Sequence, residues 1–305
     1  MRSAFFRVLV ELAAADERIQ LVVGDLGFGA IEPFAQRFPG RFLNAGVAEQ
    51  SMTGVAAGLA LCGKVVFTYS IGNFPTLRCL EQIRNDVCYH QANVKIVSVG
   101  GGLAYGSLGM THHATEDLAI MRALPGMIVV APGDPWEVEQ ATRAIAAEPG
   151  PCYLRLGRAG EPRLHGAGAL FRLGRGIRMR EGRDLTIIST GGLLESALEV
   201  AEQLATIGIE ARVVSMHTLK PLDETEVVAA ATETGAIATL EEHSLIGGLG
   251  SAVAEILAES AGSTARLKRF ALPSAFVGEA GSQEYLRARY GLSPKAVVES
   301  LQTWL

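Results

Sequence analysis

Residues 44–60, NAGVAEQSMTGVAAGLA, decide how the rest of the chain can be interpreted. From Val47 onward, small and apolar side chains recur at helical spacing, which predicts a helix of about four turns. Glu49 falls in the first turn of this helix, beside alanines and glycines that let another backbone approach closely. The helix dipole alone favours an acidic residue there. Glu49 is therefore either a capping residue or a functional carboxylate.

Segments typical of strands and helices alternate on both sides of this helix. Apolar runs typical of buried parallel strands cover residues 19–25, 64–69, 94–99 and 128–131, and helices are predicted at 79–90, 116–123 and 135–147. The alternation predicts an α/β domain of three layers with a mainly parallel sheet over residues 1–160.

A second alternation begins after a segment rich in Gly and Arg that has no apolar period. This segment, residues 161–183, is predicted to form a linker and a leading strand. Further strands are expected at 185–189, 211–215 and 236–241, and helices at 193–207, 224–234, 248–259 and 293–305. Residues 184–305 are thus predicted to form a second, smaller three-layer α/β domain.

The composition excludes several classes of function. A net charge of −5 over 305 residues, without a basic stripe, argues against a nucleic-acid partner. Charged residues interrupt the apolar patch at the N-terminus, so we expect an amphipathic helix there and neither a signal peptide nor a membrane span. Hydrophobic residues make up 49% of the chain, which indicates a large buried subunit interface.

The four cysteines show no spacing that indicates a disulfide framework or a metal site. They are Cys62, Cys79, Cys88 and Cys152. We expect reduced thiols in a cytoplasmic protein.

Four stretches that follow one another along the chain resemble a single enzyme family. They are residues 44–60, then KVVFTYSIGNFPTLRCLEQIRNDV (64–87), GMTHHATEDLAIMRALPGMIVVAPGD (109–134) and PCYLRLGRAGEP (151–162). Together they are similar to the C-terminal half of transketolase and of 1-deoxyxylulose-5-phosphate synthase, which use thiamine diphosphate. The likeness is greatest to the split transketolases, whose two halves are separate chains. The resemblance implies a pyrimidine-binding domain followed by a transketolase C-terminal domain.

The resemblance implies roles toward the cofactor for four residues. Glu49 matches the family's glutamate in Gly-Val-Ala-Glu-Gln, which hydrogen-bonds N1′ of the aminopyrimidine. Burial among Val47, Met52, Val55 and Leu59 would favour its protonated form. The ring that stacks on the aminopyrimidine is expected to be Phe74, with Tyr69 as the alternative. Asp25 either lies close to the cofactor or only ends the first strand.

Four residues are candidates to contact the substrate. His112 matches the family's Thr-His, which contacts substrate hydroxyls and moves protons near the cofactor, whereas His113 stands where the family usually has Gln and its role is open. Adjacent histidines point in different directions, so no metal site is predicted. Arg155, in preference to Arg158, is expected to hold a sugar phosphate, because the arginine fork makes two charge-assisted hydrogen bonds. An ordinary surface ion pair is the alternative.

The diphosphate end of the cofactor has no apparent site in this chain. The family holds the diphosphate and Mg²⁺ with Gly-Asp-Gly and a later Asn, and Gly24-Asp25-Leu26 is not that motif. We therefore expect an N-terminal partner subunit with the diphosphate-binding domain to hold both, in an α₂β₂ assembly. The predicted reaction moves a two-carbon ketol unit from a ketose, or its phosphate, to an aldose. The synthase's phosphate-binding arginine is replaced by glycine here, which leaves open whether the acceptor is phosphorylated.

Two other functions stay open at this point. A subunit that decarboxylates a 2-oxoacid, as in deoxyxylulose-phosphate synthase or the E1 β subunit of 2-oxoacid dehydrogenases, would share the two-domain layout. A non-catalytic regulatory subunit would keep the fold and lose the chemistry. The Gly-Met-Thr-His stretch favours transketolase over the first, and Glu49, Phe74 and His112 together argue against the second.

Overall fold

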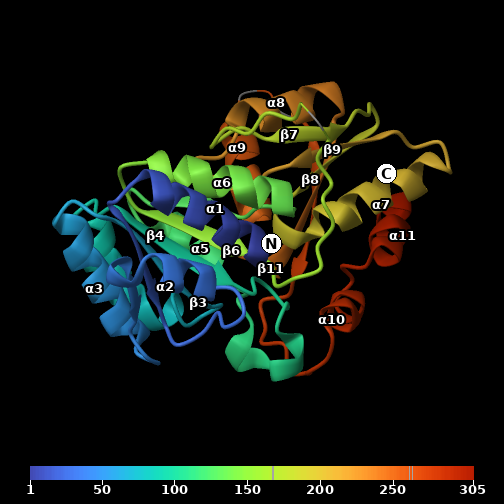
Figure 1. Cartoon of the computed structure of the whole chain (residues 1–305). Helices are drawn as coiled ribbons and strands as arrows, with labels where there is room; N and C mark the ends of the chain where they lie inside the picture. The colour runs from blue at the N-terminus through green and yellow to red at the C-terminus, as the bar shows by residue number, and fades with distance from the viewer. Residues whose placement is uncertain (167, 261, 263) are drawn as a thin grey trace.

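The computed structural model describes residues 1–166, 168–260, 262 and 264–305, and Figure 1 shows them as two α/β units that lie side by side. Each unit is built on one sheet, of seven strands in the first and five in the second. Among the described residues, no helix combines the length and the apolar character that crossing a membrane requires.

The first sheet has the strand order β10-β5-β6-β4-β3-β1-β2. Its strands are β1 (Ile19–Val23), β2 (Phe42–Asn44), β3 (Val65–Ile71), β4 (Val94–Val99), β5 (Ile128–Val130), β6 (Cys152–Leu156) and β10 (Thr218–Lys220). All neighbours are parallel except β10, which pairs antiparallel with β5. The central strands are buried on both faces, which is why they read as continuous apolar runs.

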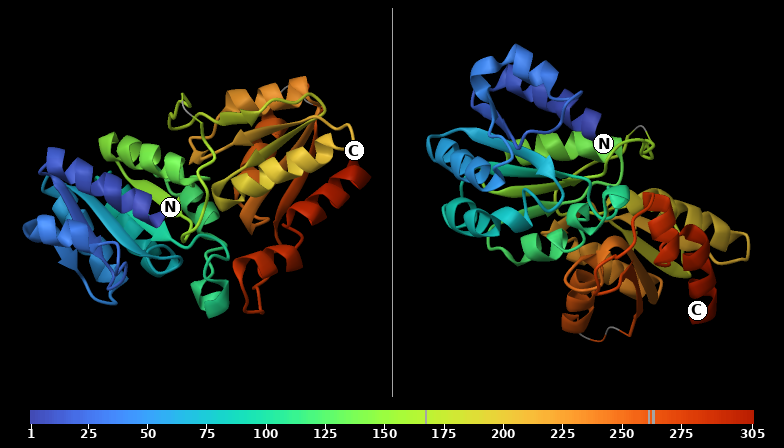
Figure 2. Two further views of the ribbon diagram at one scale, coloured as in Figure 1. Left: turned by 45° about the vertical axis from the view of Figure 1, so that its right-hand side comes forward. Right: turned by 90° about the horizontal axis from the view of Figure 1, so that it is seen from below.

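Helices cover both faces of the first sheet. One face carries α1 (Arg2–Ala15), α2 (Glu32–Arg37) and α6 (Pro135–Ala147), which pack together as Figure 2 shows. The other face carries α3 (Glu49–Leu61), α5 (Asp117–Ala123) and the segment 77–88. The helix expected at 79–90 is a 3₁₀ turn (Leu77–Cys79), one α-helical turn α4 (Leu80–Gln82) and a π-helical stretch (Ile83–Cys88).

The second sheet has the order β12-β11-β8-β9-β7 and is parallel except for β7. Its strands are β7 (Ile177–Arg180), β8 (Leu185–Ser189), β9 (Ala211–Ser215), β11 (Ala236–Ser244) and β12 (Arg266–Leu272). Helices α7 (Leu194–Ala205) and α11 (Pro294–Trp304) pack on one face, and α8 (Glu224–Glu233) and α9 (Leu249–Glu259) on the other. The short α10 (Gln283–Arg289) precedes α11. Both sheets therefore have the predicted three-layer, mainly parallel architecture.

The two units share one continuous core. A single cluster of buried side chains runs from Met52 of α3 and Met121 of α5 to Val214 of β9 and Leu249 of α9. Strand β10 follows β9 in the chain, yet it completes the edge of the first sheet. The sequence analysis missed β2 and β10, because a strand of three residues carries little pattern, and it missed the edge strand β12, because the half-exposed run RLKRFAL is not continuously apolar.

A buried histidine fastens the connecting segment to both units. Nδ1 of His165 lies 3.0 Å from Oδ2 of Asp134, and Nε2 lies 3.2 Å from Oε1 of Glu137. Ser215 of β9 donates a hydrogen bond to the same Glu137 oxygen at 2.6 Å, and the Trp136 ring stacks on the imidazole. Burial disfavours the imidazolium, but the hydrogen bond to Asp134 and the nearby Glu137 carboxylate outweigh it and raise the pKa of His165 to about 9.

We expect this contact to make the stability of the chain depend on pH. Because the folded pKa of His165, about 9, exceeds its unfolded value of 6.5, its stabilisation is complete below pH 6.5 and is lost as the pH rises through 9. A shift of this size corresponds to roughly 3 kcal/mol. Denaturant unfolding of the chain and of a His165→Gln variant across this window provides the measurement. The stability difference between the two should shrink as the pH rises, and a constant difference would contradict the assignment.

Candidate active site

Glu49 is the first residue of α3 and lies at the C-terminal edge of the first sheet, where ligands bind in parallel sheets. Its side chain is only 1% exposed. Ser70, at the end of β3, donates a hydrogen bond to Oε1 at 3.1 Å, and Nη1 of Arg78 donates to Oε2 at 2.7 Å. A Cβ atom on Gly24, just after β1, would come within 3.2 Å of the Glu49 side chain. The glycine therefore leaves room for this carboxylate.

The neighbours of Glu49 differ from those expected. Met52 is buried, but Val47, which precedes α3, and Val55, on the outer face of α3, are 74% and 41% exposed. The predicted apolar surround of Glu49 is therefore wrong, because both valines are exposed and the polar side chains of Ser70 and Arg78 contact the carboxylate instead. Val55 forms an outer stripe along α3 with Gly58 and Leu61, which are also exposed.

Phe74 and His112 are connected to Glu49 through the side chain of Arg78. Their rings meet edge to face with centroids 5.3 Å apart. The guanidinium of Arg78 lies over the Phe74 ring, with its central carbon 4.4 Å from the centroid, while it also holds Glu49. Three segments distant in sequence thus form one contiguous group. Arg78, which connects the group, was not among the predicted residues.

Tyr69 does not belong to this group. Successive side chains of a strand point to opposite faces, so Tyr69 points away from the face to which Ser70 directs its hydroxyl. It is fully buried under α1, where its ring packs against Phe5 and Phe6. The geometry therefore favours Phe74 over Tyr69 as the ring available to a ligand.

Asp25 lies at the same edge of the sheet, directly after Gly24. Its backbone has a φ of 56°, and its exposed carboxylate accepts a hydrogen bond from Nδ2 of Asn44 at 2.8 Å. The amide of Asp25 donates to Oδ1 of Asn44 at 3.1 Å. These paired contacts fix the turn that leads from β1 toward Glu49.

His113 points away from His112 into the protein. It is 3% exposed, and neither ring nitrogen has a hydrogen-bond partner among the described residues. Burial lowers its pKa, which keeps the ring neutral near pH 7. It lines a groove of about 410 Å³ together with Asn73, Met110 and Phe276.

Arg155 is buried in an ion pair at the boundary of the two units. Its Nε donates to Oδ2 of Asp117 at 2.8 Å, and its Nη2 donates to the carbonyl groups of Ala114 at 2.7 Å and Glu242 at 3.0 Å. The hydroxyl of Tyr153 donates to the same Asp117 oxygen. Arg155 therefore ties the segment after His112 to the second unit.

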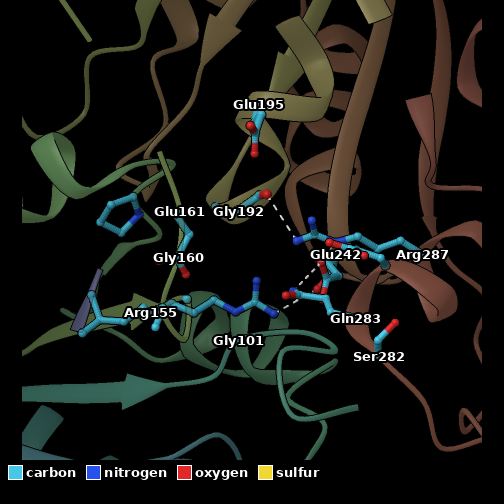
Figure 3. A pocket seen from close by; sticks show the side chains of 16 residues that line it. Gly101, Arg155, Gly160, Glu161, Gly192, Glu195, Glu242, Ser282, Gln283 and Arg287 are labelled. Carbon is cyan, nitrogen blue, oxygen red and sulfur yellow. Dashed lines mark hydrogen bonds and ion pairs between the residues drawn. The ribbon is translucent and has the colours of Figure 1, made fainter. Parts of the chain in front are cut away.

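Figure 3 shows the same guanidinium at the side of a cavity between the two units. The cavity has a volume of about 310 Å³, and Gly101, Gly192, Gln283 and Arg287 line it together with Arg155. Glu242 accepts hydrogen bonds there from Gln283 and Arg287. The arginines facing this cavity thus already hold carboxylates of the protein.

Arg158 has a different environment from Arg155. Its side chain is exposed, and its guanidinium lies 5.2 Å from the centroid of the Tyr105 ring. Within the described parts of the chain it forms no ion pair. Of the two arginines, Arg158 is the one whose donors are free for an external anion.

The other predicted features concern metals and thiols. No group of three or more His, Cys, Asp or Glu side chains could hold a metal ion within the part of the chain described. All four cysteines are free, and burial raises the pKa of Cys79, Cys88 and Cys152 to about 11.

Comparison with known proteins assigns both units to families. Residues 1–161 match the transketolase pyrimidine binding domain, and residues 174–297 match the transketolase C-terminal domain. The 6-deoxy-6-sulfo-D-fructose transketolase subunit SqwH of Clostridium sp. (strain MSTE9) is 41% identical over 98% of this chain and 92% of its own length. An apulose-4-phosphate transketolase subunit of Phocaeicola vulgatus is 38% identical over 98% of this chain and 95% of its own length.

A solved structure agrees with these relatives. A chain described as a split gene transketolase in an inactive β4 tetramer superimposes with a TM-score of 0.91 at 41% identity, covering 99% of this chain and 97% of its own length. The chain therefore belongs to the transketolase family, as the subunit of a split transketolase that carries the pyrimidine-binding and C-terminal domains.

Proposed function

We propose that this chain, with a partner subunit that carries the diphosphate-binding domain, transfers a two-carbon ketol unit from a ketose or ketose phosphate to an aldose. The observation that carries the proposal is the contiguous group of Glu49, Phe74 and His112 at the C-terminal edge of the first sheet. A buried carboxylate, an aromatic ring and a partly exposed histidine are the groups that the pyrimidine end of thiamine diphosphate and a sugar hydroxyl require.

The residues present fit the pyrimidine end of the cofactor. When bound, thiamine diphosphate supplies the nucleophilic carbon that carries the ketol unit. Glu49 would hold a proton at N1′ of the pyrimidine, and Phe74 would offer a flat apolar wall to the ring. His112 would exchange a proton with a hydroxyl of the sugar. Asp25 would lie beside the cofactor, and the buried His113 would form part of the wall of the acceptor pocket.

We assign the anionic group of the substrate to Arg158 in preference to Arg155. Arg155 already donates to Asp117 and two carbonyl groups, whereas Arg158 is exposed and forms no ion pair among the described residues. The two relatives compared above are named for a sulfo-sugar and a sugar phosphate, both of which carry an anionic group. An arginine fork suits either one.

The partner subunit would hold Mg²⁺ and the diphosphate and cover the outer stripe of α3. Exposed Val55 and Leu61 would supply apolar area there, and at Gly58 no atom lies within 4 Å of an added Cβ, which leaves space for a second backbone. We propose an α₂β₂ assembly in the cytoplasm, where the four free thiols stay reduced. The related chain that forms an inactive β4 tetramer supports the need for a second kind of subunit.

Calorimetric titration of thiamine diphosphate and Mg²⁺ tests this proposal. We expect no tight binding to the chain alone, because its sequence lacks the family's Gly-Asp-Gly diphosphate motif, and tight binding to the chain mixed with its candidate partner. Equally tight binding to the isolated chain would disprove the shared site.

The reaction type needs a separate measurement with the partner present. Transfer from a ketose donor without gas release is the expected result. Release of carbon dioxide from pyruvate or a related 2-oxoacid would instead identify a decarboxylating enzyme of the same fold.

A further inference from the structure

Arg78 covers the two groups of this chain that would receive the aminopyrimidine. Its Nη1 donates to Oε2 of Glu49 at 2.7 Å, and its planar guanidinium lies over the Phe74 ring at 4.4 Å. We infer that the Arg78 side chain occupies the pyrimidine site in the absence of the cofactor. It must be displaced before Glu49 and Phe74 can bind the cofactor. The inference rests on the function proposed above.

The contacts of Arg78 imitate those of the ring it would replace. A guanidinium is flat, carries positive charge and donates N–H groups in its own plane. An aminopyrimidine protonated at N1′ is also flat and cationic, and it also donates an N–H group in its plane. Both can therefore donate a charge-assisted hydrogen bond to the carboxylate of Glu49 and make a cation–π contact with the face of the Phe74 ring.

Of the two side chains that hydrogen-bond the Glu49 carboxylate, only Arg78 is free to leave. Ser70 is fully buried at the end of β3. The Arg78 side chain is 43% exposed, and among the described residues its guanidinium has no hydrogen bond other than the one to Glu49. Since Glu49 is only 1% exposed, a ligand reaches Oε2 by displacing Arg78.

The exchange explains why Glu49 can be buried before the cofactor binds. A buried carboxylate without a partner is costly, and Arg78 supplies that partner in the isolated chain. The cofactor then replaces one donor by another. Arg78 should therefore stabilise the isolated chain and weaken cofactor binding, two opposite effects of a single side chain.

Cofactor titration of an Arg78→Ala variant, mixed with the partner, tests the inference directly. Because the cofactor no longer has to break a hydrogen bond to a charged group, we expect its Kd to fall on the order of tenfold. Arg84→Ala is the matched control, since Arg84 is exposed in the same segment and, among the described residues, its side chain hydrogen-bonds Asn85 alone, and it should leave the Kd unchanged. Arg78→Lys keeps the charge and should bind close to the wild type.

A second readout uses the isolated chain without cofactor. Arg78→Ala should lower its Tm more than Arg84→Ala does, because Glu49 loses its partner. If Arg78→Ala weakens cofactor binding, Arg78 positions Glu49 for the cofactor and the inference is overturned. An unchanged Kd also overturns it. Should the wild-type mixture bind no cofactor at all, the proposed function itself fails, which is a distinct result.

Discussion

Replacing Glu49 by glutamine in the assembled enzyme is expected to lower the rate of ketol transfer by about 10²-fold or more. The amide keeps the size of the side chain, and its oxygen can accept from Arg78 while its NH2 donates to the Ser70 hydroxyl, so the fold and part of the cofactor affinity should persist. What is lost is a group that can exchange a proton with N1′ of the pyrimidine. Steady-state rates and calorimetric Kd values, measured on the same preparation, separate the two effects.

Glu81→Gln is the matched control for this variant. Glu81 is exposed on α4 in the neighbouring segment, and its replacement should change neither rate nor affinity. If Glu49→Gln turned over as fast as the wild type, Glu49 would be a capping residue and the catalytic assignment would be wrong. A regulatory subunit that had lost the chemistry would give that result.

Replacing Arg155 by methionine is expected to destabilise the chain by about 3–5 kcal/mol, because it leaves the carboxylate of Asp117 buried without its charged partner. Two carbonyl groups, of Ala114 and Glu242, lose their donor as well. Denaturant unfolding measures the change. A loss below about 1 kcal/mol would show that the ion pair contributes little and would return Arg155 to the substrate candidates.

Arg158→Met is the matched comparison on the same segment. An exposed arginine outside any ion pair should change the free energy of unfolding by no more than about 0.5 kcal/mol. If Arg158 holds the anionic group of the substrate, the variant should instead raise KM for an anionic sugar while affecting an uncharged sugar little. Equal effects on both sugars would contradict the assignment.

The strands were predictable because their physics is local. Strands buried on both faces are mostly apolar, and β1, β3, β4 and β5 lie where the sequence analysis placed its apolar runs. In such a continuous apolar run, the sequence does not indicate which face of the sheet a given side chain occupies. Tyr69 and Ser70 are both buried, so the sequence offered no sign that only Ser70 faces Glu49.

The site was predictable as far as single residues carry a recognisable motif. Glu49, Phe74 and His112 each lie in such a motif, and in the structure they are connected through Arg78. Arg78 was missed because its role depends on the path of the chain after β3, which sets where its guanidinium reaches. A 3₁₀ turn followed by α- and π-helical turns leaves no regular period to reveal that path.

The preference for Arg155 shows another limit of sequence reasoning. The sequence alone does not distinguish an arginine that binds a substrate phosphate from one that binds a carboxylate of the protein itself. The distinction depends on Asp117, which is 38 positions away and reaches Arg155 only through tertiary packing.

The position of β10 sets a limit on how this protein can be divided. A fragment cut within the connecting segment would lose Thr218–Lys220 from the first sheet and expose β5 as a bare edge, the kind of surface on which strands of other molecules assemble. The second fragment would keep β10 without a strand to pair with. Neither half is therefore a sound unit for recombination with other subunits, and shuffling experiments should exchange the whole chain.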